Sequence, residues 1–353
     1  MACVEGSDVH GCSRRPTPFP RVELIGKASP LLPLRNFSDG LSSTSTVQVW
    51  AKREDLIPLG LGGNKMRNME FLLAEAQQRS SDRVLVFGRP GSNHCRLAAA
   101  AAAYVALPAT VVTSGHRPVR FSAGEQLLTL LGAEVLYTND EGQVSAAALA
   151  ESERNRLLRA GSQPYLMPPG ASGVVGASGH VLAGLELARQ VQMLGIRLDF
   201  VFVGMATGGT VAGLRVGLAL AGLSSTTIVG VPTHLALAAS PASFRVELRE
   251  LTQRLLGAWG DSDREAAQAK LGQIVIDRVP WNSYGTMTPE GRGAQVRVGA
   301  AEGLLLDPVY TSHVAASLVR WAQRGELDDK YVALWVGGGI PALFEGEVPT
   351  VAS

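Results

Sequence analysis

Lys65 is the residue whose setting points most directly to chemistry. It follows Gly62, Gly63 and Asn64 and opens a stretch in which apolar residues recur at helical spacing: Met66, Met69, Leu72, Leu73 and Ala76. Partial removal from water at such a boundary lowers the pKa of a lysine and supplies the neutral amine that a Schiff base with an aldehyde cofactor needs. Taken alone, the tetrapeptide is more typical of an ordinary connector before a helix.

A glycine-rich turn lies between an apolar run at residues 200–204 and a helix predicted over 214–223. It reads Thr207-Gly208-Gly209-Thr210-Val211-Ala212-Gly213. A strand, a glycine turn and a helix start point free amides and the positive end of a helix dipole at an anion, and a phosphate fits there. The pattern is neither a Walker sequence nor the dinucleotide fingerprint, so a nucleotide is not the first choice. Considered singly, a capped turn without a ligand is the commoner meaning of this pattern.

Ser92, Asn93 and His94 form a second candidate anion site. They follow a short strand predicted over 84–87 and start an alanine-rich helix. Ser92 is a suitable N-cap, and the helix start is sized for a carboxylate. By itself this segment is more often a cap with no further role. Together, the three segments give the chain one candidate Schiff-base lysine and two candidate anion sites.

Taken together and in their order along the chain, these three segments resemble the pyridoxal-phosphate enzymes of the tryptophan-synthase-β-like fold (fold type II). The resemblance is specific to the branch of D-cysteine desulfhydrases and 1-aminocyclopropane-1-carboxylate (ACC) deaminases, and it runs from about Phe19 to about Phe344. Besides the three segments above, the motifs that carry it are Lys52-Arg53-Glu54-Asp55-Leu56, Tyr284-Gly285, Asp307-Pro308-Val309-Tyr310 and Gly338-Gly339-Ile340-Pro341-Ala342-Leu343.

The predicted fold class is α/β. Short β-branched runs alternate with helical stretches, at 84–87, 109–112, 133–137, 198–203, 228–231 and 331–336. This alternation predicts mostly parallel, twisted sheets with helices on both faces. The resemblance implies two domains around a cofactor cleft: a large one from residues 18–65 and 176–353, and a small α/β one inserted at 66–175. The breaker-rich stretch 167–173 is the predicted crossover, and residues 1–17 are expected to form a flexible leader.

Composition favours an enzyme that acts on a small molecule. The chain has 353 residues, of which 46% are hydrophobic, and its 32 basic and 31 acidic residues are interspersed to a net charge of +1. The chain therefore has no excess of positive charge that would favour binding to nucleic acid or to an anionic membrane. Since the sequence shows neither a membrane-spanning apolar segment nor a secretory signal, we expect a cytoplasmic protein.

Neither a disulfide framework nor a metal site is expected. Cys3, Cys12 and Cys95 are odd in number and widely spaced. The six histidines lack the short helical spacing typical of metal ligands.

The resemblance implies a role for each cofactor-binding residue. Lys65 forms the Schiff base with pyridoxal 5'-phosphate and moves a proton at the substrate α-carbon. Asn93 bonds the cofactor's 3-hydroxyl, and Gly337 lies beside the pyridine nitrogen. The residues expected to hold the phosphate are Thr207, Gly208, Gly209 and Thr210.

The substrate side of the site is implied in the same way. Ser92, Asn93 and His94 are expected to hold the substrate carboxylate, with Ser92 also acting on the α-proton. Tyr284 and Tyr310 match two active-site tyrosines, and a phenol acts as general acid or base only where its surroundings lower its pKa. Without the resemblance, packing in the core is the commoner role of a tyrosine.

Thr311 favours α,β-elimination as the reaction. ACC deaminases have a glutamate after the tyrosine of the Asp-Pro-Val-Tyr motif, whereas this chain has Thr311, as the desulfhydrases do. With the cofactor as electron sink, the protein decides which group departs. The predicted reaction converts a β-substituted, D-cysteine-like amino acid to a keto acid and ammonia.

Some positions depart from the desulfhydrase pattern. Gly337 replaces a threonine, Arg89 and Pro90 replace small residues, and Gly91 replaces a glutamine. These changes suggest a specialised biosynthetic member of the branch. Cyclopropane ring opening, β-replacement by a second nucleophile, and an inactive homologue that binds the cofactor or an amino acid stay open as alternatives. The resemblance also implies a homodimer.

Overall fold

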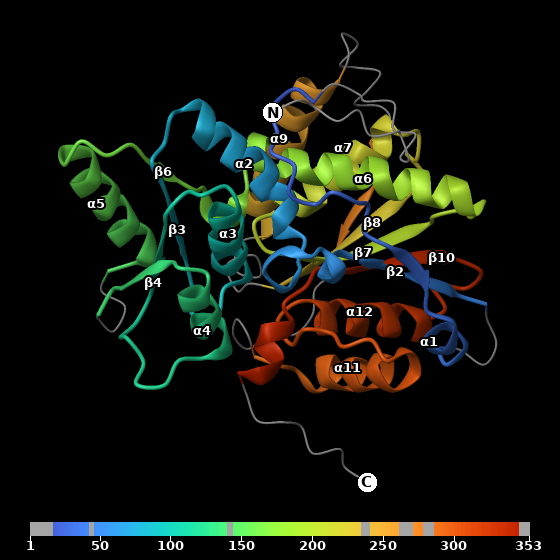
Figure 1. Ribbon diagram of the computed structural model, residues 1–353. Helices are drawn as coiled ribbons and strands as arrows, with labels where there is room; N and C mark the ends of the chain where they lie inside the picture. The colour runs from blue at the N-terminus through green and yellow to red at the C-terminus, as the bar shows by residue number, and fades with distance from the viewer. Residues whose placement is uncertain are drawn as a thin grey trace.

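The computed structural model describes residues 17–41, 46–139, 144–233, 241–260, 271–277 and 286–345. Its strands form two separate sheets, one of six strands and one of four. Figure 1 shows the smaller sheet with its helices on the left and the larger, helix-covered sheet on the right. No helix in the described ranges is long and apolar enough to cross a membrane.

The larger sheet is parallel except at one edge. Its order is β1 (Leu31–Pro33), β2 (Gln48–Arg53), β10 (Tyr331–Val336), β7 (Phe200–Met205), β8 (Thr227–Pro232) and β9 (Ile274–Ile276), and only β1 runs antiparallel to its neighbour. Both faces of this sheet are buried. Along β10, Trp335 joins the core on one face, whereas Leu334 and Val336 join the core on the other.

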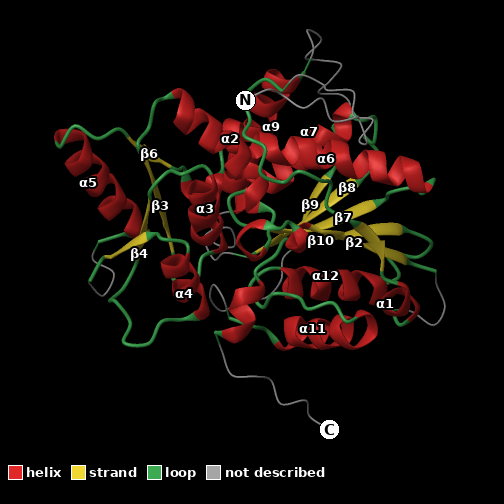
Figure 2. Ribbon diagram, viewed as in Figure 1, coloured by secondary structure: helices red, strands yellow, loops and turns green. Residues whose placement is uncertain are grey.

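Two groups of helices cover these faces. One face carries α6 (Val174–Leu194), α7 (Gly209–Leu220) and α9 (Pro241–Trp259), and the other carries α1 (Arg35–Asp39), α11 (Pro289–Glu302) and α12 (Thr311–Gln323). Figure 2 shows the sheet between these two helix layers.

The smaller sheet is wholly parallel. Its order is β5 (Glu134–Tyr137), β4 (Ala109–Thr113), β3 (Arg83–Gly88) and β6 (Pro164–Leu166). The helices α2 (Lys65–Gln78), α3 (Asn93–Tyr104) and α4 (Ala123–Leu130) lie on the face toward the larger sheet, and α5 (Ala146–Arg159) lies on the opposite face. The buried alanines of α3 let it pack closely on this sheet and on α2.

The α/β class and each predicted strand agree with the structure, whereas four strands were missed: β1, β2, β6 and β9. Three of the missed strands have only three residues, and β2 contains Lys52 and Arg53, whose charges hide its extended pattern. The four-stranded sheet falls within the predicted insertion 66–175, and the six-stranded sheet falls outside it. The domain boundaries themselves stay a prediction.

The helix predicted over 214–223 begins earlier than expected. Gly208, with φ of 80°, is its N-cap, and α7 starts at Gly209. Gly213 is therefore a packing residue inside the helix and not part of a turn. A Cβ added there would lie 2.5 Å from the Cβ of His180, so the glycine permits the close contact of α7 with α6.

A buried ion network connects β2, α2 and α6. The Lys52 ammonium pairs with Glu186, and the Arg67 guanidinium pairs with both Glu54 and Glu186. The Lys52 Nζ also donates two further hydrogen bonds, to the Ser29 carbonyl at 2.6 Å and to Gln190 Oε1 on α6 at 2.8 Å. The carboxylates hold the pKa of Arg67 above its usual value against the opposing effect of burial. Because two cations balance two anions, the network can stay buried.

Arg67→Met should destabilise the fold strongly. It would leave Glu54 and Glu186 with a single cation, and breaking a buried pair costs about 3–5 kcal/mol. Urea unfolding followed by tryptophan fluorescence measures the loss. Arg154→Met is the matched control, because Arg154 pairs with Glu151 on the exposed face of α5 and should change stability by less than about 1 kcal/mol. Equal small losses in both variants would contradict the importance of the network.

Candidate active site

A cavity of about 280 Å³ opens where the carboxyl ends of β3, β7 and β10 meet. Ligand sites in α/β proteins favour this place, because the loops after parallel strands converge there. Of the predicted site residues, the cavity is lined by Lys65, Ser92, Asn93, His94, Thr207, Gly208, Gly209, Thr210, Tyr310, Thr311 and Gly337. Tyr284 lies outside the described residues.

The backbone around Lys65 is held by contact between two glycine segments. Lys65 is the first residue of α2, and the amide of Asn64 before it donates to the Gly337 carbonyl at 2.9 Å. A Cβ added to Gly338 would lie 2.6 Å from the Cα of Gly63. The loop after β10 therefore needs glycine at position 338, because the turn before Lys65 lies directly against it.

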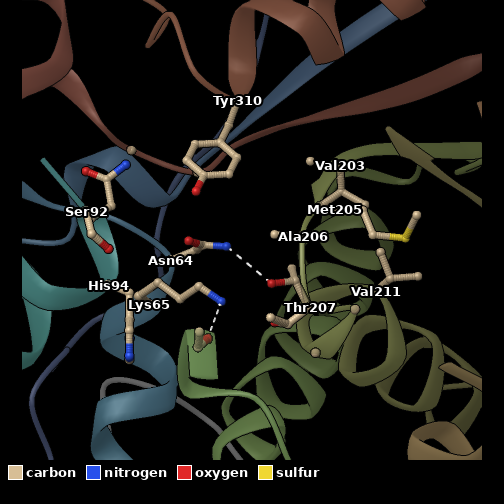
Figure 3. Close-up of a pocket in the computed structure, with 18 of the residues that line it drawn as sticks. Asn64, Lys65, Ser92, His94, Val203, Met205, Ala206, Thr207, Val211 and Tyr310 are labelled. Carbon is tan, nitrogen blue, oxygen red and sulfur yellow. Dashed lines mark hydrogen bonds between the residues drawn. The ribbon is translucent and has the colours of Figure 1, made fainter. Parts of the chain in front are cut away.

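The Lys65 amine points into the cavity, where Figure 3 shows it beside Asn64 and between His94 and Thr207. Its Nζ donates to the Gly170 carbonyl at 2.8 Å. Burial lowers the pKa of Lys65 to about 8, because no carboxylate of the described chain compensates for the lost hydration. A substantial neutral fraction at physiological pH is what an amine needs to attack an aldehyde.

The Ser92 turn presents a helix start to the same cavity. Ser92 is the N-cap of α3, as predicted, and its hydroxyl accepts from the Cys95 amide at 3.4 Å. His94 is buried, and neither ring nitrogen has a hydrogen-bond partner within the described ranges. Burial and the nearby charge of Lys65 lower the pKa of His94 to about 3, so its imidazole is neutral. A buried ring with unmet hydrogen-bonding capacity is suited to a polar ligand.

The Thr207 loop presents a second helix start. Gly208 adopts a left-handed conformation, and a Cβ there would lie 3.1 Å from Leu248 Cδ1 and 3.2 Å from Phe244 Cζ. The first backbone amides of α7 have no partner within their helix. Together with the helix dipole they make this end of the cavity a suitable place for an anion.

Tyr310 and Thr311 are positioned by one buried carboxylate. Asp307 Oδ1 accepts from the amides of Val309 and Tyr310 at 3.0 and 2.7 Å, and its Oδ2 accepts from the Thr311 amide at 2.9 Å. Burial raises the pKa of Asp307, and these hydrogen bonds oppose that rise. Tyr310 enters the cavity from the side opposite Lys65 (Figure 3).

The residues present fit pyridoxal 5'-phosphate. The cavity combines an amine of lowered pKa with two helix N-termini, which suit the phosphate of the cofactor and the carboxylate of an amino acid. Among the described residues, no group of three or more His, Cys, Asp or Glu side chains is placed to hold a metal ion.

Comparison with known proteins assigns the family. Residues 22–338 match the family model described as pyridoxal-phosphate dependent enzyme. The chain belongs to the pyridoxal-phosphate dependent enzymes. It is 34% identical over 328 residues to a Pyrococcus abyssi protein provisionally named 1-aminocyclopropane-1-carboxylate deaminase, covering 92% of this chain and 93% of that one. It is 33% identical over 350 residues to the D-cysteine desulfhydrase of Yersinia pestis (strain Pestoides F), covering 93% and 96%.

A solved structure agrees with this assignment. The crystal structure of an ACC deaminase homologue superposes with a TM-score of 0.79 at 30% identity, covering 92% of this chain and 94% of that chain. The predicted resemblance to the desulfhydrase and deaminase branch, with its fold type II architecture and pyridoxal 5'-phosphate cofactor, is thereby confirmed.

Some residues at the cavity of this pyridoxal-phosphate enzyme were not predicted. Asn64 was noted only as a neighbour of Lys65, yet it lines the cavity and bonds Thr210. Gly170 contributes only a carbonyl, which has no signal in a sequence. His180 contacts Thr210 from the middle of α6, where an isolated histidine in an apolar pattern gives no warning of a role.

Gly91, one of the departures from the desulfhydrase pattern, has a local explanation. Its φ is 71°, and a Cβ added there would lie 2.7 Å from a carboxylate oxygen of Glu345. That carboxylate accepts from the Gly124 amide at 2.8 Å, at the N-terminus of α4. Gly91 thus leaves room for a hydrogen bond that connects the chain after β10 to the smaller sheet's helices.

Lys65 should react with the cofactor with a pH dependence of its own. Only the neutral amine attacks the aldehyde, so the rate of colour formation in apoprotein mixed with pyridoxal 5'-phosphate should rise with pH and level off above about 8. An ordinary lysine would keep gaining neutral amine up to about 10.4. After borohydride reduction, mass spectrometry should locate the adduct on Lys65. Lys27→Arg should behave as the wild type, and an adduct on Lys27 or Lys52 would refute the assignment.

Gly91→Ala should cost more stability than Gly115→Ala. Both glycines have positive φ, but a Cβ on Gly115 meets nothing within 4 Å, so that variant carries only the backbone cost. Displacement of Glu345 from the Gly124 amide should add about 1–2 kcal/mol for Gly91→Ala in urea unfolding. In a Glu345→Ala background the difference between the two variants should vanish, and its persistence there would show that Glu345 is not the cause.

Proposed function

We propose that this enzyme catalyses α,β-elimination on a β-substituted, D-cysteine-like amino acid, giving a keto acid and ammonia. The observation that carries the proposal is one cavity in which the Lys65 amine lies between the helix starts at Ser92 and Gly209. An amino acid joined to the cofactor presents two anions, a carboxylate and a phosphate. Two helix N-termini flanking one amine suit that pair of charges.

The proposed substrate side is the Ser92 turn. The hydroxyl of Ser92 and the amides that begin α3 would hold the substrate carboxylate, while Asn93 would bond the ring hydroxyl of the cofactor. His94 is neutral, so it offers one N–H donor and adds no charge to compete with Lys65. Orientation by these groups would decide which bond of the α-carbon lies ready to break.

Proton transfer is proposed for Lys65, Tyr310 and Ser92, with Ser92 acting, like Lys65, on the α-proton. The cofactor, when bound, supplies the electron sink. Lys65, released as a neutral amine, would accept the proton from the substrate α-carbon, since an amine with pKa about 8 is matched to work near neutral pH. Tyr310 reaches into the cavity from the opposite side, where it could protonate the leaving β-substituent. For Tyr284 we keep the role predicted from the sequence, that of an active-site general acid or base.

Thr311 supports elimination over ring opening. It is buried and lines the cavity next to Tyr310, so this wall carries a neutral residue where the deaminase pattern has a carboxylate. The names of the relatives, D-cysteine desulfhydrase and 1-aminocyclopropane-1-carboxylate deaminase, fall on the two sides of this choice. We also propose that Gly337 lies beside the pyridine nitrogen of the cofactor, that the enzyme is cytoplasmic and that it forms a homodimer.

A substrate panel tests the reaction. D-Cysteine and related β-substituted amino acids should release sulfide or the corresponding leaving group together with ammonia and pyruvate, at higher efficiency than ACC releases ammonia and 2-oxobutyrate. The three products are measured separately, with Lys65→Ala as the inactive control. Equal or better turnover of ACC would refute elimination as the main reaction. Product formation that requires an added thiol or amine would instead indicate β-replacement.

A further inference from the structure

A buried hydrogen-bond chain lies behind the Thr207 loop. His180 Nε2 is 2.9 Å from Asn68 Oδ1 and 3.2 Å from Thr210 Oγ1, and Asn64 Nδ2 donates to the same Thr210 oxygen at 3.4 Å. His180 and Asn68 are fully buried, and Thr210 is 6% exposed and lines the cavity. The chain thus runs from Asn68 on α2 through His180 on α6 to Thr210 in the first turn of α7.

The network fixes the tautomer of His180. Asn68 Nδ2 donates to the Ala171 carbonyl at 3.0 Å, and a carbonyl can only accept, so the orientation of the Asn68 amide is set. Its Oδ1 faces His180 and needs a donor, so Nε2 carries the proton. Nδ1 is then a bare acceptor, which agrees with its lack of a partner in the described part of the chain. Burial, with the charges of Lys65 and Arg67, lowers the pKa of His180 well below its usual value and keeps the ring neutral.

This tautomer decides what the Thr210 hydroxyl can do. A hydroxyl has two acceptor sites and one proton. Asn64 donates to one acceptor site, and the single Nε2–H of His180 is shared between Asn68 Oδ1 and the other acceptor site of Thr210. Neither nitrogen has a lone pair to take the threonine proton. The proton of Thr210 is therefore directed away from both, and the open side of this residue is the cavity.

We infer that His180 is a positioning residue that makes the Thr210 hydroxyl an obligatory donor to the phosphate of the cofactor. This inference rests on the proposed role of the Thr207 loop as the phosphate site. It adds that phosphate recognition depends on a histidine that does not touch the cofactor, held in one tautomer by Asn68. Removal of His180 frees Thr210 to rotate and to turn its proton toward other acceptors, so a charge-assisted hydrogen bond is lost.

The test compares two ligands that differ only in the phosphate. Full-length protein freed of cofactor with hydroxylamine is titrated with pyridoxal 5'-phosphate and with pyridoxal, read by absorbance. His180→Ala should weaken pyridoxal 5'-phosphate binding by about tenfold to a hundredfold and pyridoxal binding by less than about twofold. His180→Gln, which restores an N–H donor, should recover part of the loss. An equal loss for both ligands, or no loss for either, overturns the inference.

A double-mutant cycle separates this inference from the proposed phosphate site. Thr210→Val should reproduce the phosphate-specific loss, and adding His180→Ala to it should cause no further loss. Additive losses would show that His180 acts independently of Thr210 and overturn the inference alone. Unchanged cofactor affinity in Thr210→Val would likewise overturn the inference alone, because the backbone amides of α7 stay in place. Equal affinity of the wild-type protein for pyridoxal 5'-phosphate and pyridoxal would overturn the phosphate assignment as well.

A matched control guards against a general effect on folding. Ser178→Ala removes another buried hydrogen bond of α6, that from Trp259 Nε1 to Ser178 Oγ at 2.8 Å, without touching Thr210. It should leave the ratio of the two affinities unchanged. If His180→Ala does not fold, His180→Gln and the Thr210→Val pair carry the comparison: the Thr210→Val background should abolish any phosphate-specific effect of His180→Gln, and an effect that persists overturns the inference.

Discussion

The buried charges around Arg67 are the constraint on which the rest of the site depends. Arg67 lies on the helix that Lys65 begins, two residues further along, and its guanidinium is fixed between Glu54 after β2 and Glu186 on α6. A guanidinium fork paired with two carboxylates tolerates little rotation or translation. The start of α2 is therefore held against the larger sheet although the body of this helix packs on the smaller one. Because Lys65 is the first residue of α2, the ion pairs of Arg67 also fix the position of its amine.

The protonation states of the buried residues depend on whether an opposite charge lies beside each of them. In the buried ion network, burial opposes every charge, but Arg67 keeps the pKa values of Glu54 and Glu186 below their usual value. Burial lowers the pKa of Lys52, and the two carboxylates oppose that fall. Among the residues that the structure describes, Lys65 has only a carbonyl partner, and burial shifts its equilibrium toward the neutral amine. His94 and His180 lie near that amine and are neutral for the same reason. The site thus combines neutral bases with two helix N-termini, and its anion-binding strength comes largely from backbone dipoles.

How much of this could be predicted from the sequence depends on what each residue contributes. Lys65, Ser92 and the Thr207 loop stand at boundaries between glycines and periodic apolar stretches, so local pattern and resemblance were enough to place them. The cavity brings these segments together, as the α/β class requires. His180 and Gly170 could not be found this way, since one lies inside an apolar helix and the other acts through its backbone. The early start of α7 was hidden because Gly213 serves packing against His180 and resembles a turn residue in sequence.

Gly337 is a position at which one residue affects both ends of the cofactor site. Its place in the desulfhydrase pattern suggests a change beside the pyridine nitrogen, but its carbonyl also accepts from the Asn64 amide that precedes Lys65. A Cβ there would meet the Asn64 side chain at 3.7 Å, an ordinary contact, so the space itself admits a larger residue. That same Asn64 side chain reaches Thr210 in the first turn of α7. A substitution at Gly337 would therefore act on the amine and on the phosphate end through one asparagine, and its effect on specificity would be inseparable from its effect on cofactor placement.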